Sequence, residues 1–102
     1  MSNLACNPLA LNVIKRQDFS SVTHNLLAGV QETRELENGF ALRFVNEAGR
    51  LGQLTEFIER ESRCCPFLNF SLEVLPEQGP VWLRLTGPAG AKEVLQAEFG
   101  FV

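Results

Sequence analysis

The chain has 102 residues, which at roughly 100 to 200 residues per domain makes one domain. Twelve acidic against nine basic residues leave a net charge of −3, and this argues against binding nucleic acid by neutralising phosphates. No run approaches the ~18 apolar residues of a membrane span, so no membrane partner is expected. We expect one domain over residues 1–102, with residues 1–14 as an irregular N-terminal segment.

The first half of the chain predicts a helix followed by a hairpin. Apolar residues within 18–27 recur with the spacing of one helix face. Two extended segments, 30–37 and 40–44, flank Asn38-Gly39. That dipeptide favours a type I′ turn, because both central positions of this turn need positive φ. We therefore expect a β-hairpin centred on Asn38 and Gly39.

The second half predicts a helix, two strands and a last helix. The helix pattern begins at Gly49 and must end near Cys64, because Pro66 pushes the residue before it out of the α region. The other expected elements are strands within 68–74 and 81–85, a turn at 76–79 and a short helix over 91–99.

The expected order of elements is αββαββα. Read from its second strand, this order lacks only the final strand of a ferredoxin-like βαββαβ domain. The first strand can supply the missing one, because in that sheet the last strand lies antiparallel beside the first. The sequence therefore predicts an α+β fold: a four-stranded antiparallel sheet with helices on one face, circularly permuted ferredoxin-like, with the 30–37 strand at an edge.

Alternation along the strands predicts what each sheet face carries. One side should face the helices, and the other should carry Arg34, Arg43 and Arg84, with Arg34 directly opposite Arg43. Like charges opposite each other destabilise a sheet unless an anion or carboxylates lie between them, and Glu32 and Glu73 are candidates. The three arginines are therefore candidate ligands for an anionic cofactor.

The same face offers apolar area. Trp82 and Val45 are expected there beside the arginines. A large patch of aromatic and arginine side chains meets protein more often than small molecules, so a homodimer through this face is the expected partner.

Three cysteines, Cys6, Cys64 and Cys65, are an odd number with two adjacent, unlike the even set of a secreted disulfide scaffold. We expect reduced cysteines and a cytoplasmic protein. Two adjacent thiolates can bind a soft metal ion, for which two or three sulfur ligands suffice. The alternative is that both cysteines are small apolar residues of the core.

Glu61 falls on the apolar side of the 49–64 helix, with Cys65 one turn further on. A carboxylate there is costly unless it is paired or protonated. Two interpretations stand: an ion pair with Arg43 or Arg84, or a base or metal ligand beside the thiols. Cys64, Cys65 and Glu61 are thus the candidate metal ligands. No catalytic residue is predicted, because the only histidine, His24, and the only aspartate, Asp18, lie in one helix.

The run Glu61-x-x-Cys64-Cys65-Pro66-Phe67 and the segment 82–93, which begins Trp-Leu-Arg-Leu-Thr-Gly-Pro, resemble a group of small bacterial proteins of unassigned function. The resemblance covers roughly the C-terminal half. It implies a bacterial cytoplasmic setting and directs attention to Glu61, Cys64, Cys65 and Arg84, but it implies no mechanism.

Two functions therefore stand as hypotheses. One is a thiol module that binds a soft metal ion or is oxidised at Cys64 and Cys65. The other is a homodimeric interaction domain with structural cysteines and no catalytic activity.

Overall fold

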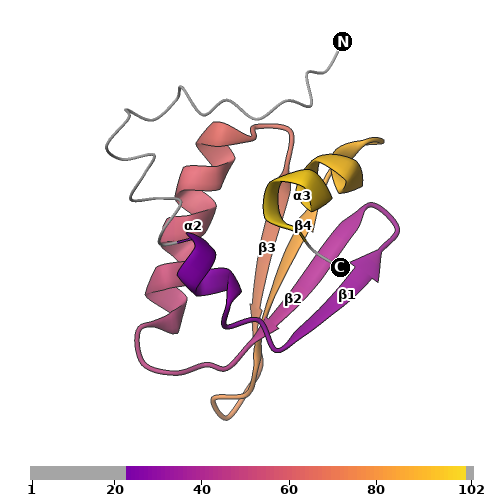
Figure 1. The fold of residues 1–102 in the computed structure, drawn as a ribbon. Coiled ribbons are helices and arrows are strands. Elements are labelled where there is room, and N and C mark those ends of the chain that lie inside the picture. The colour runs from indigo at the N-terminus through magenta and orange to yellow at the C-terminus, as the bar shows by residue number, and fades with distance from the viewer. Residues whose placement is uncertain (1–22, 101–102) are drawn as a thin grey trace.

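The computed structural model describes residues 23–100, and Figure 1 shows their fold. Residues 23–27 are helical, which confirms the end of the first predicted helix; its start and the segment 1–14 lie outside the described residues. The elements that follow are β1 (Glu32–Leu36), β2 (Gly39–Phe44), α2 (Arg50–Cys64), β3 (Asn69–Val74), β4 (Val81–Thr86) and α3 (Ala91–Phe99). Their order confirms the αββαββα prediction.

The sheet has the strand order β1-β2-β4-β3, and every neighbouring pair is antiparallel. This is the order of a circularly permuted ferredoxin-like sheet, with β1 at the edge beside β2 as predicted. The helices lie on one side of the sheet (Figure 1). Within residues 23–100, no helix is both long enough and apolar enough to cross a membrane.

The core lies between the sheet and the helices. The helix-facing residues of the two central strands, β2 and β4, are at most 1% exposed. They are Phe40, Leu42, Phe44, Val81, Leu83 and Leu85. Leu54 and Phe57 of α2 and Leu95 of α3 are buried against them, and the Phe57 ring also meets Phe99, with 5.8 Å between centroids.

The first hairpin forms, but its turn differs from the prediction. Leu36 pairs with Gly39, so Glu37 and Asn38 form the loop. Neither the two loop residues nor Gly39 has a positive φ, so the type I′ prediction for Asn38-Gly39 is wrong. The changed register also places Arg34 opposite Ala41 rather than opposite Arg43, which lies opposite Glu32.

Gly39 is needed because a neighbouring strand lies very close. A Cβ at this position would lie 1.9 Å from the Leu85 carbonyl oxygen of β4. Asn38 also accepts a hydrogen bond of 3.0 Å from the Gly87 backbone N–H. Glycine therefore allows β2 and β4 to approach each other, and its freedom in φ is not used.

The β3–β4 hairpin has the positive-φ turn that was predicted for the first hairpin. Glu77 and Gln78 have φ values of 60° and 56°, the positive values that a type I′ turn needs at both central positions. The Gly79 N–H donates to the Pro76 carbonyl at 3.0 Å. The predicted turn at 76–79 is thus confirmed, although no Asn-Gly pair forms it.

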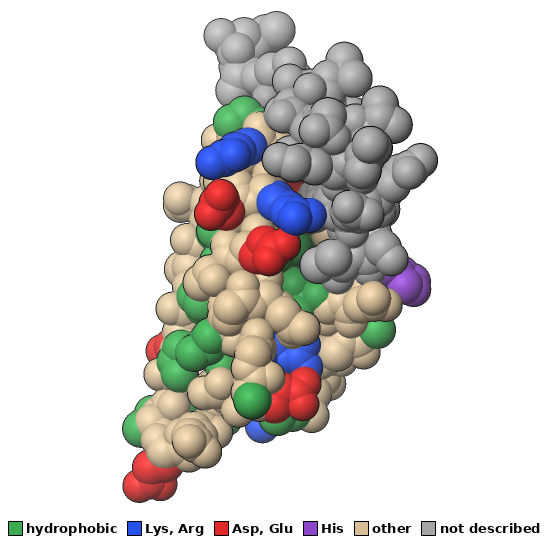
Figure 2. Space-filling view, turned by 90° about the vertical axis from the view of Figure 1, so that its left-hand side faces the viewer, with side chains coloured by type: hydrophobic (Ala, Val, Ile, Leu, Met, Phe, Trp, Pro, Cys, Tyr) green, Lys and Arg blue, Asp and Glu red, His purple; other side chains and the backbone are tan. Residues whose placement is uncertain are grey.

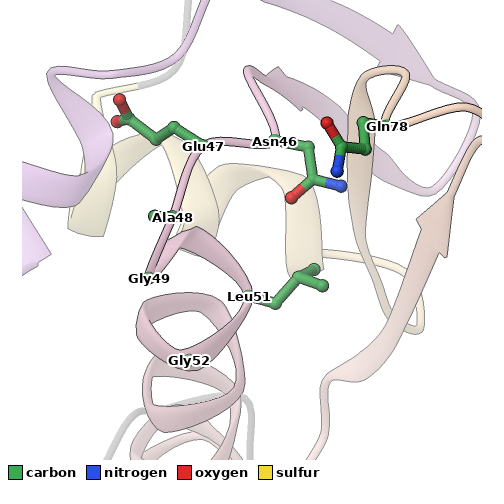
Figure 3. A pocket seen from close by; sticks show the side chains of 7 residues that line it. All are labelled: Asn46, Glu47, Ala48, Gly49, Leu51, Gly52 and Gln78. Carbon is green, nitrogen blue, oxygen red and sulfur yellow. The ribbon is translucent and has the colours of Figure 1, made fainter.

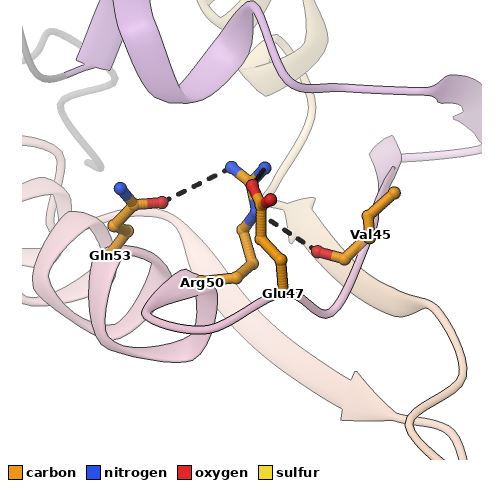
Figure 4. A network of polar contacts seen from close by, with 4 residues as sticks. All are labelled: Val45, Glu47, Arg50 and Gln53. Atoms are coloured by element: carbon orange, nitrogen blue, oxygen red, sulfur yellow. Dashed lines mark hydrogen bonds and ion pairs between the residues drawn. The ribbon is translucent and has the colours of Figure 1, made fainter.

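The start of α2 is held by a buried arginine, Arg50. Its guanidinium donates to the Val45 carbonyl at 3.2 Å, to Gln53 at 3.4 Å and to the Glu47 carboxylate at 2.6 Å (Figure 4). The guanidinium also lies over the Phe44 ring. These contacts fix the loop between β2 and α2 against the helix, and so set where the α2 face that carries Glu61 lies.

Candidate functional site

The face of the sheet opposite the helices, here called the open face, carries the three predicted arginines. The Arg34 Nε lies 2.6 Å from Glu32 Oε2, and the Arg84 guanidinium lies 3.4 Å from Glu73 Oε1. Glu32 and Glu73, the carboxylates expected to lie between the arginines, therefore pair with two of them.

These ion pairs change how the open face can be used. Two of the three guanidinium groups are neutralised by neighbours, and within residues 23–100 Arg43 makes no ion pair. Trp82 is only 8% exposed, with the Arg34 guanidinium 4.6 Å from its ring centroid. The open face is thus far less apolar than expected, and an anion site at Arg34, Arg43 and Arg84 stays a prediction.

Glu61 lies on the core side of α2 and is 1% exposed. Burial removes water from the carboxyl group and raises its pKa to about 8, with the negative charge of Glu98 on α3 adding to the rise. At neutral pH the group is therefore largely protonated, and its proton can be donated.

Cys65 directly follows α2 as its C-cap and is fully buried beside Glu61. Its backbone N–H donates to the Glu61 carbonyl at 2.7 Å, and its Sγ lies 3.6 Å from Glu61 Oε1. The φ of Cys65 is −126°, outside the helical region, as expected for a residue before proline. The helix end thus brings a sulfur and a carboxyl group together inside the core.

The two adjacent cysteines differ in their bonding. Cys64 is a buried thiol, whereas Cys65 is disulfide-bonded. The expectation that the cysteines are reduced is therefore wrong for Cys65. In the disulfide form Cys65 has no thiol hydrogen, so only the protonated carboxyl group of Glu61 can donate a hydrogen bond between them.

The expected ion pair of Glu61 does not form. Arg43 and Arg84 lie on the open face, whereas Glu61 lies in the helix layer on the other side of the sheet. Within the described residues, the Glu61 carboxyl group has its hydrogen-bonding contact with Cys65 Sγ. Glu61 is therefore stabilised by protonation, which was the other way to lower the cost of burying it.

The predicted metal ligands come together only in part. Glu61 lies beside Cys65, but no group of three or more His, Cys, Asp or Glu side chains within residues 23–100 is arranged to hold a metal ion. Binding of a soft metal ion by Cys64, Cys65 and Glu61 stays a prediction.

Two residues that matter here were missed from the sequence. Glu98 raises the pKa of Glu61, and its position three residues after Leu95 on α3 was the available signal. Arg50 lies four residues before Leu54, and so on the apolar face of α2, where a cation needs partners. Neither residue belongs to a recognisable motif.

A surface pocket at the β2–α2 loop lies away from the cysteines. Its lining residues are Asn46, Glu47, Ala48, Gly49, Leu51, Gly52 and Gln78. In Figure 3 the amides of Asn46 and Gln78 approach each other, while the Glu47 carboxylate points away. The lining has no thiol, imidazole or cation, so the pocket adds nothing to the chemistry of Cys65.

The exposed side of α2 carries no further candidate. Arg60 pairs with Glu56 at 2.9 Å and Arg63 with Glu59 at 3.5 Å, each pair one helical turn apart. Basic and acidic side chains accordingly lie next to each other in Figure 2. Such exposed pairs indicate a solvated helix face.

Comparison with known proteins adds no relative. No protein-family model, curated protein or solved structure matches this chain.

Proposed function

We propose that the protein is a thiol–disulfide redox module in which Cys65 is the redox-active residue and Glu61 carries its proton. The observation that supports this most is the buried contact of 3.6 Å between Cys65 Sγ and Glu61 Oε1. A thiolate buried without a cation is costly, so a sulfur in this position needs a proton donor when its disulfide breaks. Glu61, with a pKa of about 8, holds such a proton at neutral pH.

Reduction by a dithiol would run in two displacements. One thiolate of the dithiol attacks the sulfur bonded to Cys65, the S–S bond breaks, and Cys65 leaves as a thiolate that takes the proton of Glu61. The second thiolate then attacks the mixed disulfide, so that the dithiol ends as a disulfide and both protein sulfurs are reduced. Oxidation by a disulfide-bonded partner runs in reverse, with the Glu61 carboxylate accepting the thiol proton.

This function agrees with the cytoplasmic setting that the resemblance to small bacterial proteins implies. Disulfides in the cytoplasm of most bacteria are transient and belong to catalytic or redox-sensing cysteines. A disulfide at Cys65 that forms and breaks would fit that setting, whereas a permanent one would not.

The test follows reduction of the oxidised full-length protein by dithiothreitol as a function of pH. Glu61→Gln removes the proton donor and keeps the shape of the side chain. We expect this variant to be reduced roughly 10- to 100-fold more slowly than the natural protein below pH 8. A plot of its reduction rate against pH should also lack the change of slope near pH 8. Glu59→Gln, which changes an exposed carboxylate of the same helix, is the matched control and should keep the profile of the natural protein. An unchanged rate and profile in Glu61→Gln would reject the proposal.

A soft metal ion is the second candidate ligand of the site. Cys64 is a buried thiol directly beside Cys65 in the sequence, so reduction of Cys65 would offer two adjacent sulfurs with Glu61 as an oxygen donor. Titration of the reduced protein with Hg(II) tests this. Tight one-to-one binding that is lost in both Cys64→Ser and Cys65→Ser supports a metal function, and equal binding by all three proteins opposes it.

The homodimeric interaction domain is the other candidate, with the open face as its interface. Arg43, which makes no ion pair within the described residues, and the half-exposed Val45 favour it. The small exposed area of Trp82 argues against a large apolar interface there. Arg43→Glu should dissociate such a dimer in sedimentation experiments, and an unaffected dimer would exclude this face.

A further inference from the structure

Within residues 23–100, β3 is an edge strand, because it pairs there with β4 alone. An edge strand presents unpaired N–H and C=O groups that can pair with another chain, and proteins usually protect such an edge with charges. β1, at the other edge, carries three charged residues among its five. β3 carries one among six, Glu73, and that carboxylate already pairs with Arg84. The β3 edge is therefore the less protected of the two.

The helix-facing side chains of β3 are also poorly covered. In the rows of the sheet, Phe70 lies beside Leu85, Leu72 beside Leu83 and Val74 beside Val81. The three β4 residues are completely buried, whereas Phe70 and Leu72 are half-buried and Val74 is 47% exposed. Figure 2, which views the molecule from the left-hand side of Figure 1, shows hydrophobic side chains at the surface below the grey atoms. One more strand beside β3 would extend each apolar row.

The sequence of β3 is complementary to itself. When two copies pair antiparallel about Leu72, Leu72 faces its own equivalent and Phe70 faces Val74 of the second copy. On the open face, Ser71 then lies opposite Glu73 of the second copy, so no two like charges meet. Pairing about Glu73 would put two carboxylates opposite each other, and pairing about Ser71 would leave Val74 beyond the paired segment.

We propose that two copies of this chain associate through β3, antiparallel about Leu72, so that two four-stranded sheets become one continuous sheet. The backbone groups of the edge supply the hydrogen bonds, and the apolar row from Phe70 to Val74 supplies the buried area. A contact of this size belongs to the small, reversible class of interfaces, so the dimer dissociates on dilution.

The test is sedimentation of the full-length protein from low to high micromolar concentration. Ser71→Glu places a carboxylate opposite Glu73 of the second copy at both symmetric positions, while Arg84 beside it supports the fold of each copy. We expect dimer affinity to fall about 10-fold in Ser71→Glu and to rise in Ser71→Lys. Thr33→Glu, the same change on the β1 edge, is the matched control and should leave the affinity unchanged.

Hydrogen exchange gives an independent readout. Amides of β3 should become more protected as concentration rises, while those of β1 should not. A monomer at every concentration would overturn the proposal. A dimer that responds to Arg43→Glu or Thr33→Glu but not to Ser71→Glu would overturn it as well, because the contact would then lie on the open face or on β1.

Discussion

The Arg34 guanidinium lies 4.6 Å from the centroid of the Trp82 ring, on the sheet face that no helix covers. Its Nε is held at 2.6 Å by Glu32 of the same strand, so the cation is fixed above the indole. Trp82 is 8% exposed, although no helix or strand of residues 23–100 covers that face. The Arg34 side chain thus contributes to covering the Trp82 ring while its charged end stays largely in water.

We expect Arg34→Ala to expose the Trp82 indole and to lower the free energy of unfolding by about 0.5–1 kcal/mol, because the cation–π contact and the covering methylene groups are lost. Tryptophan fluorescence, which reports on Trp82 alone in this chain, should shift to longer wavelength. Arg63→Ala on α2 removes only an exposed ion pair and should leave the spectrum unchanged. An unshifted spectrum in Arg34→Ala would contradict the role assigned to Arg34.

Glu61 makes stability depend on pH in a defined direction. Its pKa rises from 4.5 to about 8 on folding, so between these values the folded chain binds one more proton than the unfolded chain. Stability should therefore fall as pH rises from about 4.5 to about 8, by an amount on the order of a few kcal/mol, and this contribution should not change further above pH 8. Denaturant unfolding across this range measures it, and Glu61→Gln should remove the slope. A Glu61→Gln profile as steep as that of the natural protein would show that another group titrates.

Glu98→Gln tests the electrostatic part of this effect. Removing the negative charge of Glu98 should lower the pKa of Glu61, although burial, the larger cause, keeps it above the ordinary glutamate value. A ¹³C NMR titration of the Glu61 carboxyl group measures the change. Glu93→Gln, which alters another carboxylate of α3, is the control and should have a smaller effect. Equal effects from the two variants would rule out a specific influence of Glu98.

Two glycines should respond oppositely to alanine. Gly39→Ala places a methyl group 1.9 Å from the Leu85 carbonyl oxygen, so the central strands must separate and we expect a loss above about 3 kcal/mol. Gly52→Ala lies inside α2 with no atom within 4 Å of the new Cβ, so it should stabilise the protein by up to about 1 kcal/mol. Thermal unfolding of both variants measures these changes in stability. A Gly39→Ala variant as stable as the natural protein would contradict the close approach of β2 and β4.

Cys64 should be protected from thiol reagents. It is a buried cysteine of the core, so a reagent such as a maleimide should react at the rate of global or local opening and much faster in denaturant. Cys64→Ser should reduce stability by about 1–3 kcal/mol, because a buried hydroxyl needs a hydrogen-bond partner. Rapid labelling of Cys64 in the native protein would contradict its burial.

The sequence alone determined the order and type of the elements. Alternation in β2, β3 and β4, the helical spacing of buried residues in α2 and the stop before Pro66 are local patterns, and each matches the structure. The ferredoxin-like topology followed, because few ways exist to pair four such strands without crossing connections.

Local patterns failed where two segments meet. The Asn38-Gly39 pair predicted a type I′ turn, but β4 lies so close that Gly39 is needed for space, and the register moved with it. The positive φ values appeared instead at Glu77 and Gln78, where the closure of the β3–β4 hairpin imposes them.

The chemistry of Glu61 was likewise decided by tertiary structure. Its place on the apolar face of α2 was visible in the sequence, and so was the need for a partner or a proton. Only the packing of α2 and α3 on one side of the sheet separates Glu61 from Arg43 and Arg84, brings Glu98 near and excludes water. A pKa depends on the charges and solvent around a group in three dimensions, and neighbours from distant segments do not appear in a local pattern.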